Sequence, residues 1–112
     1  MVKKFQNKSK AIKQDQIKQL LEELVEKDLK ITKRALEKVQ IIAPGRSYAN
    51  KIAEDFLEMA RAYYNDAVHF REKRDLVRAV ACVNYAHGWL DAGARLGVFD
   101  VSEDDRLFTL AE

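Results

Sequence analysis

The only proline of the chain stands beside a glycine, at Pro44-Gly45, and no other glycine or proline precedes this pair. Because proline lacks a backbone N–H and glycine favours turns, the pair is expected to end a helix. The residues before it repeat apolar side chains at spacings of three and four, which predicts an amphipathic helix over about residues 15–42. The predicted apolar face consists of Ile17, Leu20, Leu21, Leu24, Ile31, Ala35, Val39 and Ile42. Asp28 is the one acid on that face.

Two further helices follow the Pro-Gly break. Ser47 is a suitable N-cap for a helix that reaches about Lys73. Its apolar face is Tyr48, Ile52, Phe56, Met59, Tyr63, Ala67 and Phe70. Asp75 is the expected N-cap of a third helix over residues 76–96, which Gly97 should end. Since the connection between these two helices is very short, we expect them to be antiparallel.

These elements predict an all-α fold, a three-helix up-down-up bundle with a short C-terminal helical turn. At 1.5 Å per residue the three helices would be roughly 42, 40 and 32 Å long, which are compatible lengths for a bundle. The bundle is expected over residues 14–97, after a basic N-terminal arm at 1–13. Residues 98–112 combine acids with apolar side chains, and Ser102 and Asp105 have the spacing of a capping box. We expect this tail to pack on the bundle.

Composition limits the possible function classes. A chain of 112 residues with 47% hydrophobic and 34% charged residues is expected to form one domain. Its net charge of +2 is too small to indicate nucleic-acid binding by the whole molecule. The single cysteine, Cys82, cannot form an intramolecular disulfide, which favours a reducing compartment. No apolar run approaches the roughly 18 residues of a membrane span, and no apolar signal segment is evident. We therefore expect a cytoplasmic protein without membrane contact.

Four polar side chains of the third helix share one strip. Asn84, His87, Asp91 and Arg95 fall within an arc of roughly 80° around the helix axis. His87 and Asp91 are four residues apart, as are Asp91 and Arg95, so both pairs can interact along the helix. The hairpin geometry predicts that this strip lies opposite Arg61 of the second helix. Three interpretations stay open: a solvated strip, a seam against a partner or the tail, and a ligand or catalytic site.

The other side of the third helix carries surplus apolar surface. Tyr85, Trp89 and Leu96 form this second apolar face together with Cys82. Large exposed apolar patches usually mark contacts with partners. We therefore predict that Tyr85, Trp89 and Leu96 belong to an interface if the first helix does not cover them.

Spacing argues against several chemistries. A metal site needs three or four ligands, but the two histidines, His69 and His87, would lie roughly 12 Å apart along the bundle. Cys82 lies among apolar neighbours, where an inert thiol is expected. No glycine-rich phosphate loop is present. We accordingly assign no metal, no cofactor and no catalytic residue.

Three segments carry a resemblance to a known family: YYNDAVHF at residues 63–70, NYAHGWLDAGARLG at 84–97 and DDRLFTL at 104–110. Over about residues 43–110 the chain resembles an archaeal family of small helical proteins, domain of unknown function 357. The resemblance implies a three-helix up-and-down bundle and an archaeal cytoplasmic setting. It implies no established activity, so it transfers no site residue to this chain.

The leading functional hypothesis is a non-enzymatic module that binds another protein or forms a homodimer. The second hypothesis is RNA or DNA binding through the lysine-rich arm, which carries Lys3, Lys4, Lys8, Lys10 and Lys13. The third is a small-ligand or hydrolytic site at His87 and Asp91.

Overall fold

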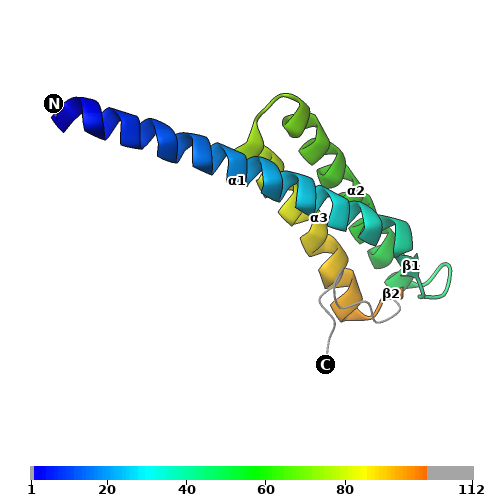
Figure 1. Cartoon of the computed structure of the whole chain (residues 1–112). Helices are drawn as coiled ribbons and strands as arrows, with labels where there is room; N and C mark the ends of the chain where they lie inside the picture. The colour runs from blue at the N-terminus through cyan, green and yellow to red at the C-terminus, as the bar shows by residue number, and fades with distance from the viewer. Residues whose placement is uncertain (1, 101–112) are drawn as a thin grey trace.

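The computed structural model describes the backbone of residues 2–100 and the side chains of residues 13–100. The elements in chain order are α1 (Val2–Lys38), β1 (Gln40–Ile41), α2 (Tyr48–Glu72), α3 (Leu76–Leu96) and β2 (Phe99–Asp100) (Figure 1). The predicted all-α three-helix bundle is confirmed. From residue 101 onward, the tail with its expected helical turn lies outside the described residues.

Helices α2 and α3 begin and end at the residues that the local sequence indicated. The Ser47 hydroxyl accepts a hydrogen bond from the Asn50 backbone N–H at 3.0 Å. The Asp75 carboxylate accepts one from the backbone N–H of Arg78 at 3.2 Å. Gly97 ends α3 in the left-handed conformation, with φ of +83°, and its N–H donates to Gly93 and Ala94 carbonyls. These caps satisfy backbone groups that a helix end leaves unpaired.

Helix α1 differs from its predicted bounds at both ends. It starts at Val2 rather than near residue 15, because nothing in residues 2–14 breaks a helix. It ends at Lys38 rather than at 42, because Gln40–Ile41 pairs with Phe99–Asp100 in a short antiparallel ladder. The Ile42 N–H extends the ladder by donating to the Val98 carbonyl at 3.1 Å. The β-branched residues of this segment suit an extended backbone. Pairing with Phe99–Asp100, far away in the sequence, makes the segment a strand and not a helix.

The three helices alternate in direction, and α1 extends well past the α2–α3 hairpin (Figure 1). This overhang gives the molecule an elongated shape of 70 × 29 × 18 Å. Exposed ion pairs lie where α1 meets the turn of the hairpin: Arg71 with Glu26 at 3.3 Å, and Arg74 with Glu22 at 3.7 Å. None of the described helices is long and apolar enough to cross a membrane.

The core forms two clusters between the helices, and both are rich in alanine. The cluster near the strands consists of Ala35, Ala53, Leu57, Ala60, Leu90, Val98 and Phe99. The cluster near the hairpin turn consists of Val25, Leu29, Ala67, Leu76, Ala79 and Val83. Small side chains allow the helix backbones to approach closely. At Gly93 the Phe99 ring of β2 packs directly on the α3 backbone, so an added Cβ would overlap the ring.

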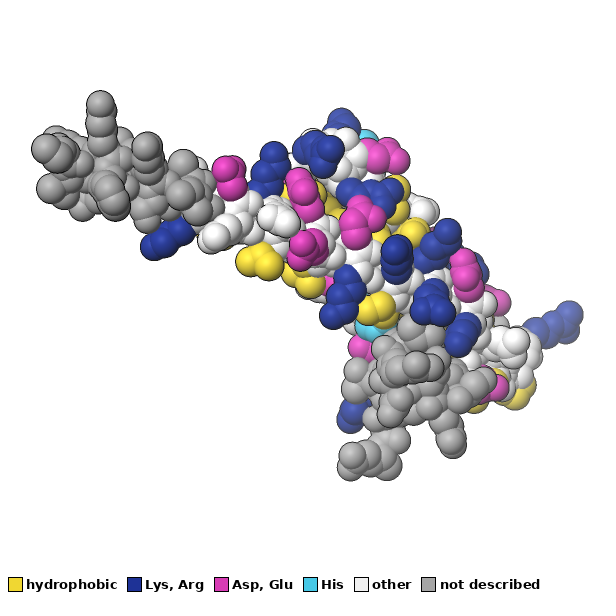
Figure 2. Space-filling view, viewed as in Figure 1, with side chains coloured by type: hydrophobic (Ala, Val, Ile, Leu, Met, Phe, Trp, Pro, Cys, Tyr) yellow, Lys and Arg dark blue, Asp and Glu magenta, His cyan; other side chains and the backbone are white. Residues whose placement is uncertain are grey.

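The core face of α1 agrees with the predicted one only in part: Ala35 is buried, and Leu21, Ile31 and Val39 pack against the core. Its buried residues are Val25, Leu29, Thr32 and Ala35. Ile17, Leu20 and Leu24, which were assigned to the core, are 57%, 63% and 40% exposed. The apolar arc of α1 is wider than the surface that the hairpin offers, so only one side of the arc is covered. Figure 2 shows the uncovered hydrophobic side chains in yellow along one edge of α1.

Candidate functional site

The predicted polar strip of α3 lies against α1, not against Arg61 of α2. His87 and Asp91 are half-buried, whereas Asn84 and Arg95 are exposed. Helix α1 crosses the hairpin on the side toward which the strip points, so α1 covers the strip and α2 does not. The strip is therefore a seam inside the chain over its central part, at His87 and Asp91.

A chain of polar contacts connects the two helices at this seam. The Thr32 hydroxyl lies 3.2 Å from His87 Nδ1, and His87 Nε2 lies 3.5 Å from Asp91 Oδ1. In the tautomer with the proton on Nε2, the hydroxyl donates to Nδ1 and the imidazole N–H points to the carboxylate. Thr32 is 1% exposed, and among residues 13–100 it is the only polar or charged residue that is buried. The contact between Thr32 and His87 therefore helps to hold α1 on α3.

A groove of about 410 Å³ opens beside these contacts. It is lined by Asp28, Ile31 and Thr32 of α1 and by Asn84, His87, Gly88 and Asp91 of α3. This volume is at the small end of ligand pockets, which range over roughly 300–1,000 Å³. Within the described part of the chain, no group of three or more His, Cys, Asp or Glu side chains is placed to hold a metal ion. Arg95 does not belong to the lining, so the strip contributes three of its four members.

Sequence reasoning missed the contribution of α1 to this groove. Asp28 and Thr32 are one helical turn apart and face α3. A signal for them existed, because Asp28 interrupts the apolar face of the first helix. It could not be interpreted without knowing which helix the polar strip faces.

The predicted interface of Tyr85, Trp89 and Leu96 is partly covered by α2. Trp89 packs edge-to-face on Phe56, with ring centroids 5.1 Å apart, and is half-buried. Its indole N–H is buried and has no hydrogen-bond acceptor among the described residues. Tyr85 lies beside Tyr63, with ring centroids 4.7 Å apart, yet remains 58% exposed. Leu96 is also exposed.

A shallow hollow of about 390 Å³ lies on the solvent side of α3. Its lining consists of Ala81, Asn84, Tyr85, Gly88 and Trp89. Asn84 and Gly88 also line the polar groove, so the two depressions adjoin. Its lining combines the small residues Ala81 and Gly88 with the larger Tyr85 and Trp89.

Cys82 is half-buried at the edge of the α2–α3 contact. Burial raises the pKa of its thiol above the ordinary value, and the nearby carboxylates of Asp66 and Asp75 raise it further. A raised pKa keeps the sulfur protonated and weakly nucleophilic at neutral pH. This direction agrees with the inert thiol predicted from its apolar neighbours.

The fold and these surfaces can now be compared with known proteins. A family model described as "Protein of unknown function (DUF357)" matches residues 27–99. Searches of curated proteins and of solved structures gave no significant match. The match extends from the second half of α1 to β2, so it includes both sides of the polar groove and starts earlier than the resemblance indicated. Because it covers more than half of the chain, the protein belongs to the DUF357 family.

Proposed function

We propose that this protein is a non-enzymatic helical module that binds another helix through the outer face of α3. The observation that supports this is the composition of that face. Its members, the α3 outer face from here on, are exposed and uncharged: Val77, Ala81, Asn84, Tyr85, Gly88, Ala92 and Leu96.

A solvent-facing helix surface normally carries charged side chains, which keep the helix soluble and avoid apolar patches. The exposed charges of α3 are Arg78 and Arg95, near its two ends. Between them the exposed positions carry alanine, asparagine, tyrosine and glycine only. Tyrosine is enriched in interfaces, and small residues let a second helix approach closely.

The polar groove supports the non-enzymatic part of the proposal. Its histidine is engaged with Thr32 and Asp91, and the Thr32 hydroxyl beside it is largely buried. A hydrolytic site at His87 and Asp91 would therefore need a carboxylate or a water molecule as its nucleophile, and this hypothesis stays a prediction. The hypothesis of nucleic-acid binding depended on the lysine-rich arm, and of its five lysines only Lys13, which is exposed, has its side chain within the described residues. It stays a prediction.

An archaeal source and a cytoplasmic location, both expected from the sequence, belong to the same proposal. In such a setting the partner would be another cytoplasmic helical protein or a second copy.

The test compares two exposed alanines in neighbouring helices, Ala81 on the α3 outer face and Ala62 on α2. Tagged wild type, Ala81→Arg and Ala62→Arg would be used to capture proteins from an extract of the source organism, with quantification by mass spectrometry. We expect Ala81→Arg to lose partners that wild type and Ala62→Arg retain. Identical sets for the two variants, with the wild-type oligomeric state unchanged in both, would contradict the proposal.

A further inference from the structure

We infer that the helix bound by the α3 outer face is α1 of a second copy of this chain, in a two-fold exchange of helices. The inference rests on the proposed function, because it names the partner for the same face. The segment that docks is the α1 outer stripe, which consists of Ile17, Leu20 and Leu24.

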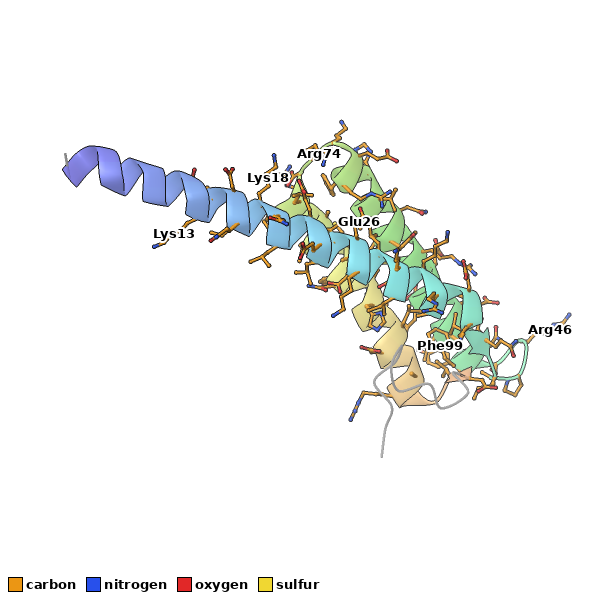
Figure 3. All side chains as sticks on the ribbon, viewed as in Figure 1. Lys13, Lys18, Glu26, Arg46, Arg74 and Phe99 are labelled. Atoms are coloured by element: carbon orange, nitrogen blue, oxygen red, sulfur yellow. The ribbon has the colours of Figure 1, made fainter. Side chains whose placement is uncertain are left out.

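The α1 outer stripe has the form of a docking ridge. Its three branched side chains follow each other at spacings of three and four, so they lie on one side of the helix. All three are exposed although they belong to the largest apolar residue types. Figure 3 shows Lys13 on the part of α1 that projects past the hairpin. The stripe thus begins on a segment that no other described helix covers.

The hollow on α3 has the matching form and length. From Ala81 to Trp89 it extends over roughly 12 Å of helix, and the stripe from Ile17 to Leu24 extends over roughly 10 Å. Large side chains on one helix pack into the depressions between side chains of another. Here the lining combines the small Ala81 and Gly88 with the larger Tyr85.

Both surfaces remain exposed in a single copy, and this points to a second copy as the occupant. In the single chain, α1 already packs on α3 through an adjacent face, with Val25, Leu29 and Thr32. A two-fold arrangement would place each stripe on the other copy's hollow, so it would cover both surfaces at once. Such an interface is closed and does not grow into a filament.

The charges beside the two surfaces favour α1 over a second α3 as the occupant. Two of the four acids in residues 13–26 already pair within the chain, Glu22 with Arg74 and Glu26 with Arg71. The remaining Asp15 and Glu23 balance Lys13 and Lys18, so this segment brings no excess positive charge. The exposed charges of α3 are Arg78, which pairs with Asp75, and Arg95. Two α3 faces would bring these arginines together, whereas the α1 outer stripe would not.

The first experiment measures self-association of the full chain by sedimentation equilibrium, from about 1 µM to about 500 µM. Leu20→Arg is matched with Gln19→Arg, which adds the same charge about 100° away around the α1 axis, outside the stripe. Ala81→Arg is matched with Ala62→Arg. We expect a wild-type dimer, with Kd raised about tenfold or more by Leu20→Arg and by Ala81→Arg, and both controls close to wild type. Circular dichroism should show unchanged helix content in all four variants.

The second experiment mixes the two defective variants, one of them tagged. A heterodimer of Leu20→Arg and Ala81→Arg contains one intact contact, because the Ala81→Arg copy donates a normal α1 to a normal α3. We expect the mixture to associate more strongly than either variant alone, because both substitutions fall in the same contact, where the second adds little to the loss that the first has caused. No gain on mixing would overturn the exchange, as would a dimer that only one of the two variants weakens.

The two proposals fail in different ways. A wild type that stays monomeric up to about 500 µM would overturn the second copy as partner. The proposed function would survive that result if Ala81→Arg still lost a captured partner that Ala62→Arg retained. If Ala81→Arg behaved like Ala62→Arg in both assays, the α3 outer face would bind nothing and both proposals would be wrong.

Discussion

The outward faces of α2 and α3 differ sharply, although the two helices lie side by side and share one core. The exposed side of α2 carries charges along its whole length: Lys51, Glu54, Asp55, Glu58, Arg61, Asp66 and Glu72. The exposed side of α3 carries only Arg78 and Arg95, separated by more than four turns. Toward each other, both helices present alanine, at Ala53, Ala60 and Ala67 on α2 and at Ala79 and Ala86 on α3.

This difference distinguishes the residues that helix packing requires from the residues that contact with water requires. Close contact between the two helices accounts for their inner alanines and leaves their outer residues unconstrained. On α2 the outer positions carry the charges that water favours. On α3 they do not, so the demands of the monomer do not explain its outer face. The contact proposed above, made only in an assembly, would explain it.

Helix α3 has one glycine on its inner face, Gly93, and one on its outer face, Gly88. A substitution at Gly93 should give the largest change in stability. In Gly93→Ala the new methyl would overlap the Phe99 ring, which is 3% exposed. We expect the free energy of unfolding to fall by about 2 kcal/mol or more, because overpacking exceeds the gain in helix propensity. Urea denaturation of dilute protein measures this. A stability equal to or above wild type would mean that the inner face of α3 is not packed as described.

The polar seam should give the next largest effect. Thr32→Val keeps the shape of the side chain and removes the hydroxyl that lies against His87 Nδ1. We expect a loss of about 1–2 kcal/mol, since a half-buried ring nitrogen loses its partner. A double-mutant cycle with His87→Ala isolates the contact, and we expect a coupling energy of about 1 kcal/mol. Zero coupling would mean that His87 does not hold α1 on α3, and a ligand role would then gain support.

The outer glycine should change stability in the opposite direction. Nothing lies within 4 Å of a Cβ added at Gly88. Gly88→Ala should therefore stabilise the dilute monomer by about 1 kcal/mol, the usual gain for this change inside a helix. The same urea titration measures it, with Gly93→Ala as the contrast. Destabilisation would show that the α3 outer face is already covered within the chain, and the contrast with α2 would disappear.

The sequence predicted those features that neighbouring residues decide. Ser47, Asp75 and Gly97 fix helix ends through bonds to residues a few positions away, so their caps were correct. The end of α1 was wrong because Ile41 pairs with Phe99, far along the chain. The exposure of Leu20 was missed because the apolar arc of α1 is wider than its contact. Periodicity gives the width of such an arc but not the side that the neighbours cover.

The same limit applies to the candidate site. The angular arrangement of Asn84, His87 and Asp91 followed from the helix repeat alone, and the structure places all three in one groove. The residues that contact them could not be predicted in the same way, because a strip on one helix of three can face either of the other two. Hairpin geometry assigned it to α2, and the crossing of α1 placed Thr32 there instead.

The smallest effect concerns Cys82, which lies where the charged side of α2 meets α3. Burial raises the pKa of its thiol most, and Asp66 on α2 raises it next. Alkylation by iodoacetamide near pH 8 should be slower in the folded protein than in urea, and Asp66→Asn should make it faster. Asp55→Asn, an exposed acid near the start of α2, is the control and should have no effect. Because the folded state holds this proton more tightly, its contribution to stability should decline as pH rises past the ordinary thiol value of 9.0. Equal rates for folded and unfolded chains would place Cys82 in open solvent, away from the charges of α2.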